Sequence, residues 1–317
     1  MIRLRPTRSL TLIELLLVLT ILAALAGSAA SFVEEADDQL RYQDTQNRLT
    51  SLREGILGRA AAGRAKHDGF VADLGRLPVT VKELLDPGAL PAWQIDPPTL
   101  IDLASVPPTG LGYGWRGPYV PSLPRVSGER AYPDGWGNLG LSGEPADDFG
   151  WRVQLSGSDL TIQSRGRGGL VGATPGDSYS TDYPNGPLVL AADHALDLNG
   201  WNVRVHISAA SASTVRLRLR YFGEVAGTPS QIAYLSDALS LAAGTSGSQT
   251  FTFNLGGSKL VPWGLKALDL VDDGGAPLTE FNGPGDGGYA AQSGVQRLEL
   301  YPRASLPTDL PAGWSLP

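Results

Sequence analysis

The chain of 317 residues contains no cysteine and only three histidines. Without cysteine it can form no disulfide framework, no thiolate metal site and no cysteine nucleophile. The histidines, His67, His194 and His206, lack the spacing of a metal-binding pair. Phosphate-cradling loops, dinucleotide fingerprints and nucleophile elbows are also missing from the sequence. We therefore expect that the protein is not an enzyme, and an exported hydrolase is the weakest of the functions considered.

Positive charge is also scarce. Lys and Arg number 25 against 32 Asp and Glu, which gives a formal net charge of −7. A nucleic-acid-binding protein needs a basic face, so no nucleic-acid partner is expected. The chain is instead rich in helix-breaking residues, with 40 Gly and 24 Pro. These numbers argue against an all-helical bundle and favour a fold with many turns.

The N-terminus concentrates the apolar residues. Arg3, Arg5 and Arg8 precede an apolar run that begins at Leu15 and extends, with small residues, to Phe32. Basic residues before an apolar run indicate insertion into a membrane with the basic end in the cytoplasm. The 23 residues 10–32 are long enough to cross about 30 Å of hydrocarbon. A cleaved secretory signal and a plain membrane anchor both fit these features, and Ala24-Leu25-Ala26 would serve as a signal cleavage site.

Glu14 argues against both of these simple interpretations. A carboxylate near the start of an apolar helix costs about 2–3 kcal/mol in a bilayer. A generic signal or anchor has no reason to carry one. The residue lies in the segment Leu10-Thr11-Leu12-Ile13-Glu14, directly after Ser9. This segment resembles the processing site of type IV pilins and type II secretion pseudopilins, although Ser9 stands where the family has Gly and Leu10 where it usually has Phe.

The resemblance implies how the N-terminus is processed and used. Prepilin peptidase would cleave between Ser9 and Leu10, and Leu10 would then be N-methylated. Glu14 of one subunit would pair with the new amine at Leu10 of a neighbour, since each charge is costly alone in an apolar core and tolerable when paired. The implied partners are other pilin or pseudopilin subunits, the inner membrane and its assembly platform. The protein would be a single-pass inner-membrane protein before assembly and part of a periplasmic or cell-surface filament afterwards.

The sequence predicts four regions. A leader (1–9) precedes a transmembrane and assembly helix (10–66), whose apolar residues Leu49, Leu52 and Ile56 follow helical spacing. A head (67–184) and a β-rich C-terminal region (185–317) follow. The fold class expected is α+β: a long helix packed on a small antiparallel sheet, as in pilins, with an antiparallel β-sandwich-like extension.

The head contains three features with recognisable patterns. Thr80 and Glu83 have capping-box spacing, which predicts a short helix near residue 81. Two aromatic segments, 115–119 (WRGPY) and 134–138 (DGWGN), are similar in order to segments of the major type II pseudopilin, with Gly135 in place of that family's Pro and its next aromatic residue displaced to Trp151. Alternating residues in 151–155 and 160–164 predict a hairpin that turns at Gly157.

The next loop carries the only metal-site prediction. In the resembled family this loop binds calcium, an ion that prefers six to eight oxygen ligands. Asp177 and Asp182 are the candidate carboxylate ligands, whereas Arg167 stands where the family tends to have Asp. The alternative is a solvated loop of Gly, Ser and Asp without an ion.

The C-terminal region contains five short alternating segments that predict strands: 202–207, 214–221, 250–255, 265–271 and 295–301. In Val215-Arg216-Leu217-Arg218-Leu219-Arg220-Tyr221 the arginines alternate with apolar residues, which predicts one buried and one solvated face. No family is recognised for this region.

The sequence therefore favours a structural subunit of a type II secretion pseudopilus or a type IV pilus-like filament. The C-terminal extension favours a minor or specialised subunit, because extra bulk at every lattice position would be hard to accommodate. The alternative from a different class is a membrane-tethered or secreted β-sandwich binding module, for example one for carbohydrate. The two differ in the mature N-terminus, which would be methylated Leu10 in a pilin and Gly27 in a secreted protein.

Overall fold

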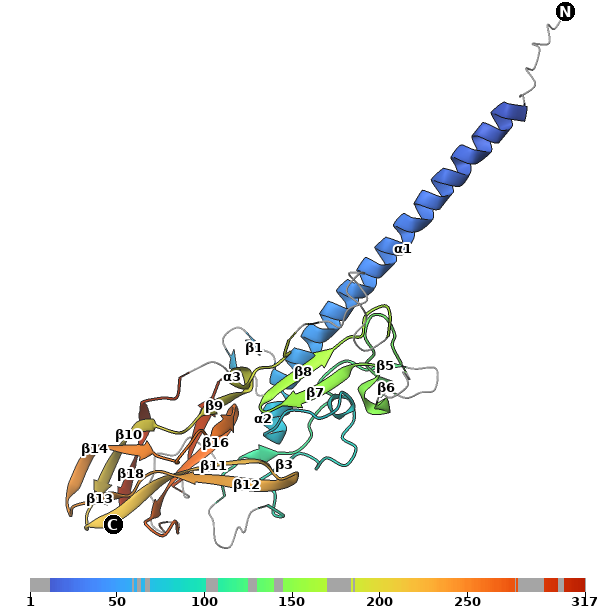
Figure 1. The fold of residues 1–317 in the computed structure, drawn as a ribbon. Helices are drawn as coiled ribbons and strands as arrows, with labels where there is room; N and C mark the ends of the chain where they lie inside the picture. The colour runs from blue at the N-terminus through green and yellow to red at the C-terminus, as the bar shows by residue number, and fades with distance from the viewer. Residues whose placement is uncertain are drawn as a thin grey trace, which may run out of the picture.

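The computed structural model describes residues 12–58, 60–61, 64–65, 69–100, 108–124, 130–139, 145–169, 184, 186–276, 278, 294–301 and 305–316. A long N-terminal helix, α1, projects from a β-rich body, and the C-terminal strands lie at the end of the molecule opposite the N-terminus (Figure 1). The fold is therefore α+β, as predicted, with a long N-terminal helix followed by mainly antiparallel sheets.

Helix α1 spans Leu12–Leu57 without interruption. At 1.5 Å per residue it is about 69 Å long. It ends nearer the N-terminus than the predicted limit at residue 66, because Gly58 takes a left-handed backbone conformation with φ of 80°. Two short strands, β1 (Ala60–Ala61) and β2 (Arg64–Ala65), pair in the segment that we had expected to be helical.

The head is built from short elements. Its helices are α2 (Phe70–Leu74), η1 (Lys82–Leu84) and η2 (Ala146–Asp148). Its strands form antiparallel pairs: β3 (Gln94–Ile95) with β4 (Gly112–Tyr113), β5 (Leu123–Pro124) with β6 (Arg130–Ala131), and β7 (Arg152–Ser156) with β8 (Asp159–Gln163). The β7–β8 pair confirms the predicted hairpin, with Gly157 in the turn at φ of 62°. Among the described head residues these strands do not join into the single small sheet that we predicted.

The short helix predicted near residue 81 is present as η1, but its N-terminus differs from the prediction. The Glu83 side chain does not close a capping box with Thr80. It accepts a hydrogen bond from the backbone N–H of Val79 at 3.0 Å and pairs with Arg76 at 2.9 Å. The capping-box spacing had assigned the Glu83 carboxylate to the N-terminus of the helix. The carboxylate pairs instead with the Arg76 guanidinium, since a charge-assisted hydrogen bond is stronger than a neutral one.

The C-terminal region forms two larger sheets after a short helix, α3 (Ala191–His194). The first has the order β14-β10-β18, and the second the order β12-β11-β16-β17, with β13 also pairing with β11. Strands β9 and β15 form a separate pair. The bounds are β9 Ala195–Asp197, β10 Trp201–Ala209, β11 Ser213–Val225, β12 Thr228–Leu235, β13 Leu239–Leu241, β14 Thr245–Phe253, β15 Leu260–Pro262, β16 Gly264–Asp272, β17 Gln296–Leu300 and β18 Asp309–Leu316.

All five predicted C-terminal strands are present, as β10, β11, β14, β16 and β17. One pairing differs from the expected antiparallel arrangement, because the last strand, β18, runs parallel to β10. Buried side chains of both larger sheets form one cluster, in which Val205 of β10 and Trp314 of β18 meet Leu217 of β11 and Leu268 of β16. These two sheets are called the two-sheet unit below.

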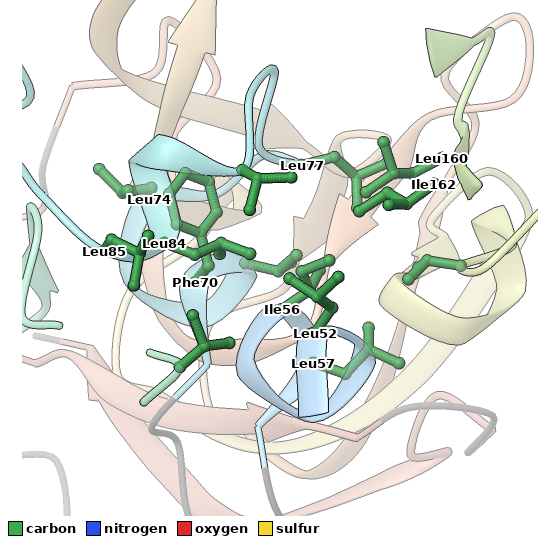
Figure 2. Close-up of a cluster of buried hydrophobic side chains, with 14 of the residues drawn as sticks. Leu52, Ile56, Leu57, Phe70, Leu74, Leu77, Leu84, Leu85, Leu160 and Ile162 are labelled. Atoms are coloured by element: carbon green, nitrogen blue, oxygen red, sulfur yellow. The ribbon is translucent and has the colours of Figure 1, made fainter. Parts of the chain in front are cut away.

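A second buried cluster joins α1 to the head (Figure 2). Leu52 and Ile56 of α1 are fully buried against Phe70 and Leu74 of α2 and Leu160 of β8. This cluster also contains Phe222 of β11 and Ala267 of β16. The five-stranded sheet therefore has a buried layer on each face, and the packing continues across the boundary predicted at residue 184.

Two of the three arginines on this face of β11 are buried and only Arg216 is partly exposed, which corrects the prediction of a wet face. The side chain of Arg218 is 9% exposed and that of Arg220 is 1% exposed. Asp269 on the neighbouring strand β16 lies between them, with Arg218 Nε 3.1 Å from Oδ1 and Arg220 Nη2 3.2 Å from Oδ2. Alternation along β11 correctly separated two faces, but most of the charged face is buried too, and Phe222 on it belongs to the cluster that joins α1 to the head.

Candidate membrane anchor and assembly helix

The first half of α1 is an apolar surface that no other described part of the chain covers. Every described residue from Leu12 to Val33 is exposed, including Leu12 at 82% and Phe32 at 72%. These residues span about 31 Å at 1.5 Å per residue, close to the hydrocarbon thickness of a bilayer. This part of α1 is therefore long and apolar enough to cross a membrane.

Glu14 lies in the first turn of α1 and is exposed. A carboxylate at a helix N-terminus interacts favourably with the helix dipole. Ser9 and Leu10, the residues predicted to flank the processing site, lie outside the described residues. The helix is continuous through Ala26 and Gly27, where the alternative signal cleavage site would fall.

The second half of α1 is held by the head on one face only. Thr45, Leu49, Leu52 and Ile56 are buried, whereas Gln39, Arg41, Gln43, Asn47 and Thr50 are exposed. Polar contacts reinforce this face: Arg48 Nη1 donates to the carbonyl of Pro133 at 2.8 Å, and Arg53 Nη2 lies 3.0 Å from Asp193 Oδ2 of α3. The helix is thus anchored to both the head and the start of the C-terminal region.

The 134–138 segment packs against α1 through Gly135. Its backbone N–H donates to Thr45 Oγ1 at 3.0 Å, and a Cβ at this position would lie 2.2 Å from the carbonyl oxygen of Arg41. The buried Asp134 accepts hydrogen bonds from Asn138 Nδ2 at 2.9 Å and from Ser164 Oγ at 2.7 Å. This segment therefore ties the helix to the loop that follows β8.

The 115–119 segment closes the other side of the head. Tyr119 and Arg116 both donate to the buried carboxylate of Asp73, at 2.9 Å in each case. Trp115 Nε1 donates to the carbonyl of Glu83 at 2.7 Å. Burial and the nearby Asp73 raise the pKa of the Tyr119 hydroxyl, so it remains a donor at neutral pH.

Trp151, predicted as the displaced aromatic, is also in this core and donates to the carbonyl of Tyr132 at 2.6 Å.

The predicted calcium ligands Asp177 and Asp182 lie outside the described residues. Nothing in the described part of the chain groups three or more His, Asp or Glu side chains as a metal site would. Arg167, on the same loop, pairs with Asp38 of α1 at 2.7 Å. A guanidinium therefore joins this loop to the helix.

Sequence reasoning missed the contacts that join the head to the two-sheet unit. Arg76 Nε lies 2.6 Å from Glu224 Oε1 of β11, while its Nη1 lies 2.9 Å from Glu83 of the head. A cleft of about 510 Å³ opens beside these residues, between η1 and the β11–β12 turn. Arg76 and Glu224 are separated by almost 150 residues, so no local spacing could have indicated their contact.

Comparisons of the chain with protein-family models, with curated proteins and with solved structures found no match. The long N-terminal helix followed by sheets is compatible with the architecture of pilins.

Proposed function

We propose that the protein is a structural subunit of a type II secretion pseudopilus or type IV pilus-like filament. One observation carries the proposal: a single continuous helix carries Glu14 in its first turn, exposes an apolar surface of membrane length and then continues into the core of the head. A secretory signal has the same length and composition, but it would be removed and would not need to continue into the core of the head. The two-sheet unit supports a minor or specialised subunit.

In this proposal α1 has two successive roles. It first anchors the chain in the inner membrane, where its apolar residues are covered by lipid. After cleavage by prepilin peptidase, it moves into the filament, where the same residues are covered by helices of neighbouring subunits. Pairing of Glu14 with the amine of Leu10 in a neighbour would then set the axial register between subunits, because each charge is tolerable in an apolar core only when paired.

The first experiment determines the mature N-terminus by mass spectrometry of protein purified from its own cells. The proposal predicts that the mature chain begins with N-methylated Leu10. A chain that begins at Gly27 would contradict the proposal and support the secreted binding module.

The second experiment measures incorporation into sheared filaments. Glu14→Ala should remain in the membrane fraction but be lost from filaments. Glu35→Ala is the matched control, because Glu35 is an exposed carboxylate on the same helix beyond the apolar segment. Normal incorporation of Glu14→Ala would rule out the proposed pairing.

A further inference from the structure

The cleft between the head and the two-sheet unit has walls from distant parts of the chain. The head supplies η1 with its flanks, the loop 86–91 and Asp147, whereas the two-sheet unit supplies Glu224, Gly227 and Pro229 at the β11–β12 turn. The volume of about 510 Å³ lies within the range of ligand pockets, about 300–1,000 Å³. The cleft is therefore large enough to hold a long side chain of a partner.

Hydrogen bonds within the chain hold both walls in place. Asp86 Oδ1 accepts from the backbone N–H of Gly88 at 2.8 Å, and the carbonyl of Pro91 accepts from the backbone N–H of Trp115 at 2.7 Å. On the opposite wall, the two residues of the β11–β12 turn have φ of 51° and 78°, as in a tight type I′ hairpin. The cleft is thus formed before a partner binds, which lowers the entropy that binding costs.

The lining of the cleft has an excess of negative charge. Its formal charge is −2, because it contains four carboxylates and two cations: Glu83, Asp86, Asp147 and Glu224 against Arg76 and Lys82. A cleft lined mainly by one sign of charge attracts ligands of the opposite sign.

The excess arises at Glu224 and Asp86. Arg76 lies between two carboxylates, with Nε 2.6 Å from Glu224 Oε1 and Nη1 2.9 Å from Glu83 Oε2. These three side chains are each less than one fifth exposed, and one guanidinium neutralises only one of the two carboxylates. Asp86 is exposed, and no cation among the described residues pairs with it.

These contacts favour an organic cation over two other classes of ligand. An anion would compete with carboxylates for both cations of the lining, because Arg76 is paired twice and Lys82 lies 3.0 Å from Asp147. A metal ion prefers several oxygen ligands that converge on one point. The carboxylates of this lining lie apart, and the described part of the chain groups no three such side chains as a metal site would.

The apolar part of the lining indicates which organic cation fits. Val79, Leu90 and three prolines lie beside the carboxylates. Lysine and arginine side chains combine an apolar stem with a charged end, so the stem can pack on these residues while the charge reaches a carboxylate. Val79 is 50% exposed and would be covered by such a stem.

The cleft also continues into an open sheet edge. Pro229, in the lining, is the second residue of β12, which is the edge strand of the five-stranded sheet. Among the described strands only β11 pairs with β12, and Thr228–Leu235 contain no charged residue. An uncharged edge strand can accept a further strand through its backbone. A polypeptide can therefore use both the cleft and the edge, whereas a free cation can use only the cleft.

We propose that the cleft binds a lysine or arginine side chain from an extended segment of a partner protein. The same segment continues along the outer edge of β12 as an added strand. This inference goes beyond the proposed function: it concerns a partner of the head and the two-sheet unit, and its test requires no filament.

The test uses the purified full-length protein in detergent and a library of random peptides. The parent should enrich peptides that carry lysine or arginine next to alternating apolar residues. Glu224→Gln with Asp86→Asn should weaken binding of these peptides at least tenfold, measured by fluorescence anisotropy at about 0.15 M salt, where exposed charges farther than about 8 Å are screened. Glu34→Gln with Glu35→Gln is the matched control, since it removes two exposed carboxylates from α1, and should stay within twofold of the parent. Equal weakening in both variants, or no enrichment of basic residues, would overturn the proposal.

A second variant covers the case in which Glu224→Gln disturbs the ion pair with Arg76. Ala89 is exposed in the lining, so Ala89→Trp obstructs the cleft without a change of charge. It should also weaken peptide binding at least tenfold, whereas Ala243→Trp, at an exposed turn of the two-sheet unit, should not. Parent-level binding by Ala89→Trp would overturn the proposal.

Further measurements identify the occupant. N-methylation of alternate backbone nitrogens of a selected peptide should abolish binding for one alternate set and spare it for the other, because only one set faces β12. Equal effects of the two sets would rule out the added strand. Spermidine that binds as tightly as the peptides would assign the cleft to a free cation, and self-association of the parent that Ala89→Trp abolishes would assign it to a second copy. Either result would overturn the proposal.

Discussion

Gly135 donates its backbone N–H to Thr45 Oγ1 of α1 at 3.0 Å, and Thr45 in turn donates to the carbonyl of Arg41 at 2.9 Å. The glycine lies so close to the helix that a Cβ would be 2.2 Å from the Arg41 carbonyl oxygen. The proline that the resembled family has at this position could neither donate this hydrogen bond nor fit the space. The contact between Gly135 and the buried Thr45 therefore docks the head on α1, and it requires glycine at position 135.

Thr45→Val should lower the free energy of unfolding by about 1–3 kcal/mol, because the partly buried N–H of Gly135 loses its acceptor. Thr50→Val is the matched control: Thr50 makes the same bond within the helix, to the carbonyl of Gln46 at 3.0 Å, but is exposed. Chemical denaturation of the full-length protein in detergent measures both. Equal effects of the two substitutions would show that the Gly135 hydrogen bond has no net value.

Gly135→Pro should destabilise the head further than Thr45→Val, because it adds a steric conflict with the backbone of α1 to the lost hydrogen bond. Gly186→Ala is the control, since a Cβ at that position meets no atom within 4 Å. The measurement is the midpoint of thermal unfolding. A Gly135→Pro variant as stable as the parent would mean that this segment moves freely relative to the helix.

Asp269→Asn should destabilise the protein by about 3–5 kcal/mol, because it leaves the buried guanidinium groups of Arg218 and Arg220 without their shared carboxylate. Arginine cannot relieve this cost by losing its proton at ordinary pH. Asp309→Asn removes an ion pair to Arg204 in which both side chains are more than half exposed, and should change stability little. Denaturation midpoints compare the two variants, and a small effect of Asp269→Asn would contradict the buried position of this cluster.

Lys266 should make stability depend on pH. Its side chain is buried. The Nζ atom lies 5.1 Å from the ring centroid of Tyr221 and 3.3 Å from the carbonyl oxygen of Trp263. Burial lowers its pKa from 10.5 to about 7. Between these values the unfolded chain binds more protons than the folded one, so the free energy of unfolding rises with pH, by up to about 1.4 kcal/mol per unit.

The measurement is the free energy of unfolding from pH 7 to 9, below the range in which tyrosines ionise. Lys266→Met should be more stable than the parent at pH 7 and should lose the rise. Lys259→Met, at an exposed position, should keep it. A parent protein with no rise would show that water reaches the ammonium of Lys266.

The sequence predicted those elements whose signal is local. The α1 helix, the β7–β8 hairpin and the strands β10, β11, β14, β16 and β17 all follow from periodicity within a few residues. The predicted end of α1, at residue 66, lies too far along the chain, because no proline directly follows Leu57 to mark where the helix stops. The left-handed conformation of Gly58 ends the helix instead.

The remaining errors arise from contacts between distant segments. Arg218 and Arg220 alternate with leucines as a solvated face would, but both are buried against Asp269 of β16, which lies about 50 residues later in the chain. The parallel pairing of β18 with β10 also joins segments about 100 residues apart. For the candidate site, sequence predicted the anchor and Glu14. The docking of α1 through Thr45, and the ties from Arg76 to Glu224 and from Arg53 to Asp193, required the structure.

The double-faced burial of the five-stranded sheet has a consequence for the order of folding. The core beneath α1 includes Phe70 from the start of the head, Phe222 and Ala267 from the middle of the extension, and Val295 near the end of the chain. A chain that emerges N-terminus first therefore cannot complete this core until almost its whole length is available. Truncated products would keep the apolar helix but lack a closed head. Only a chain of almost full length could therefore bring a folded subunit to its neighbours through α1.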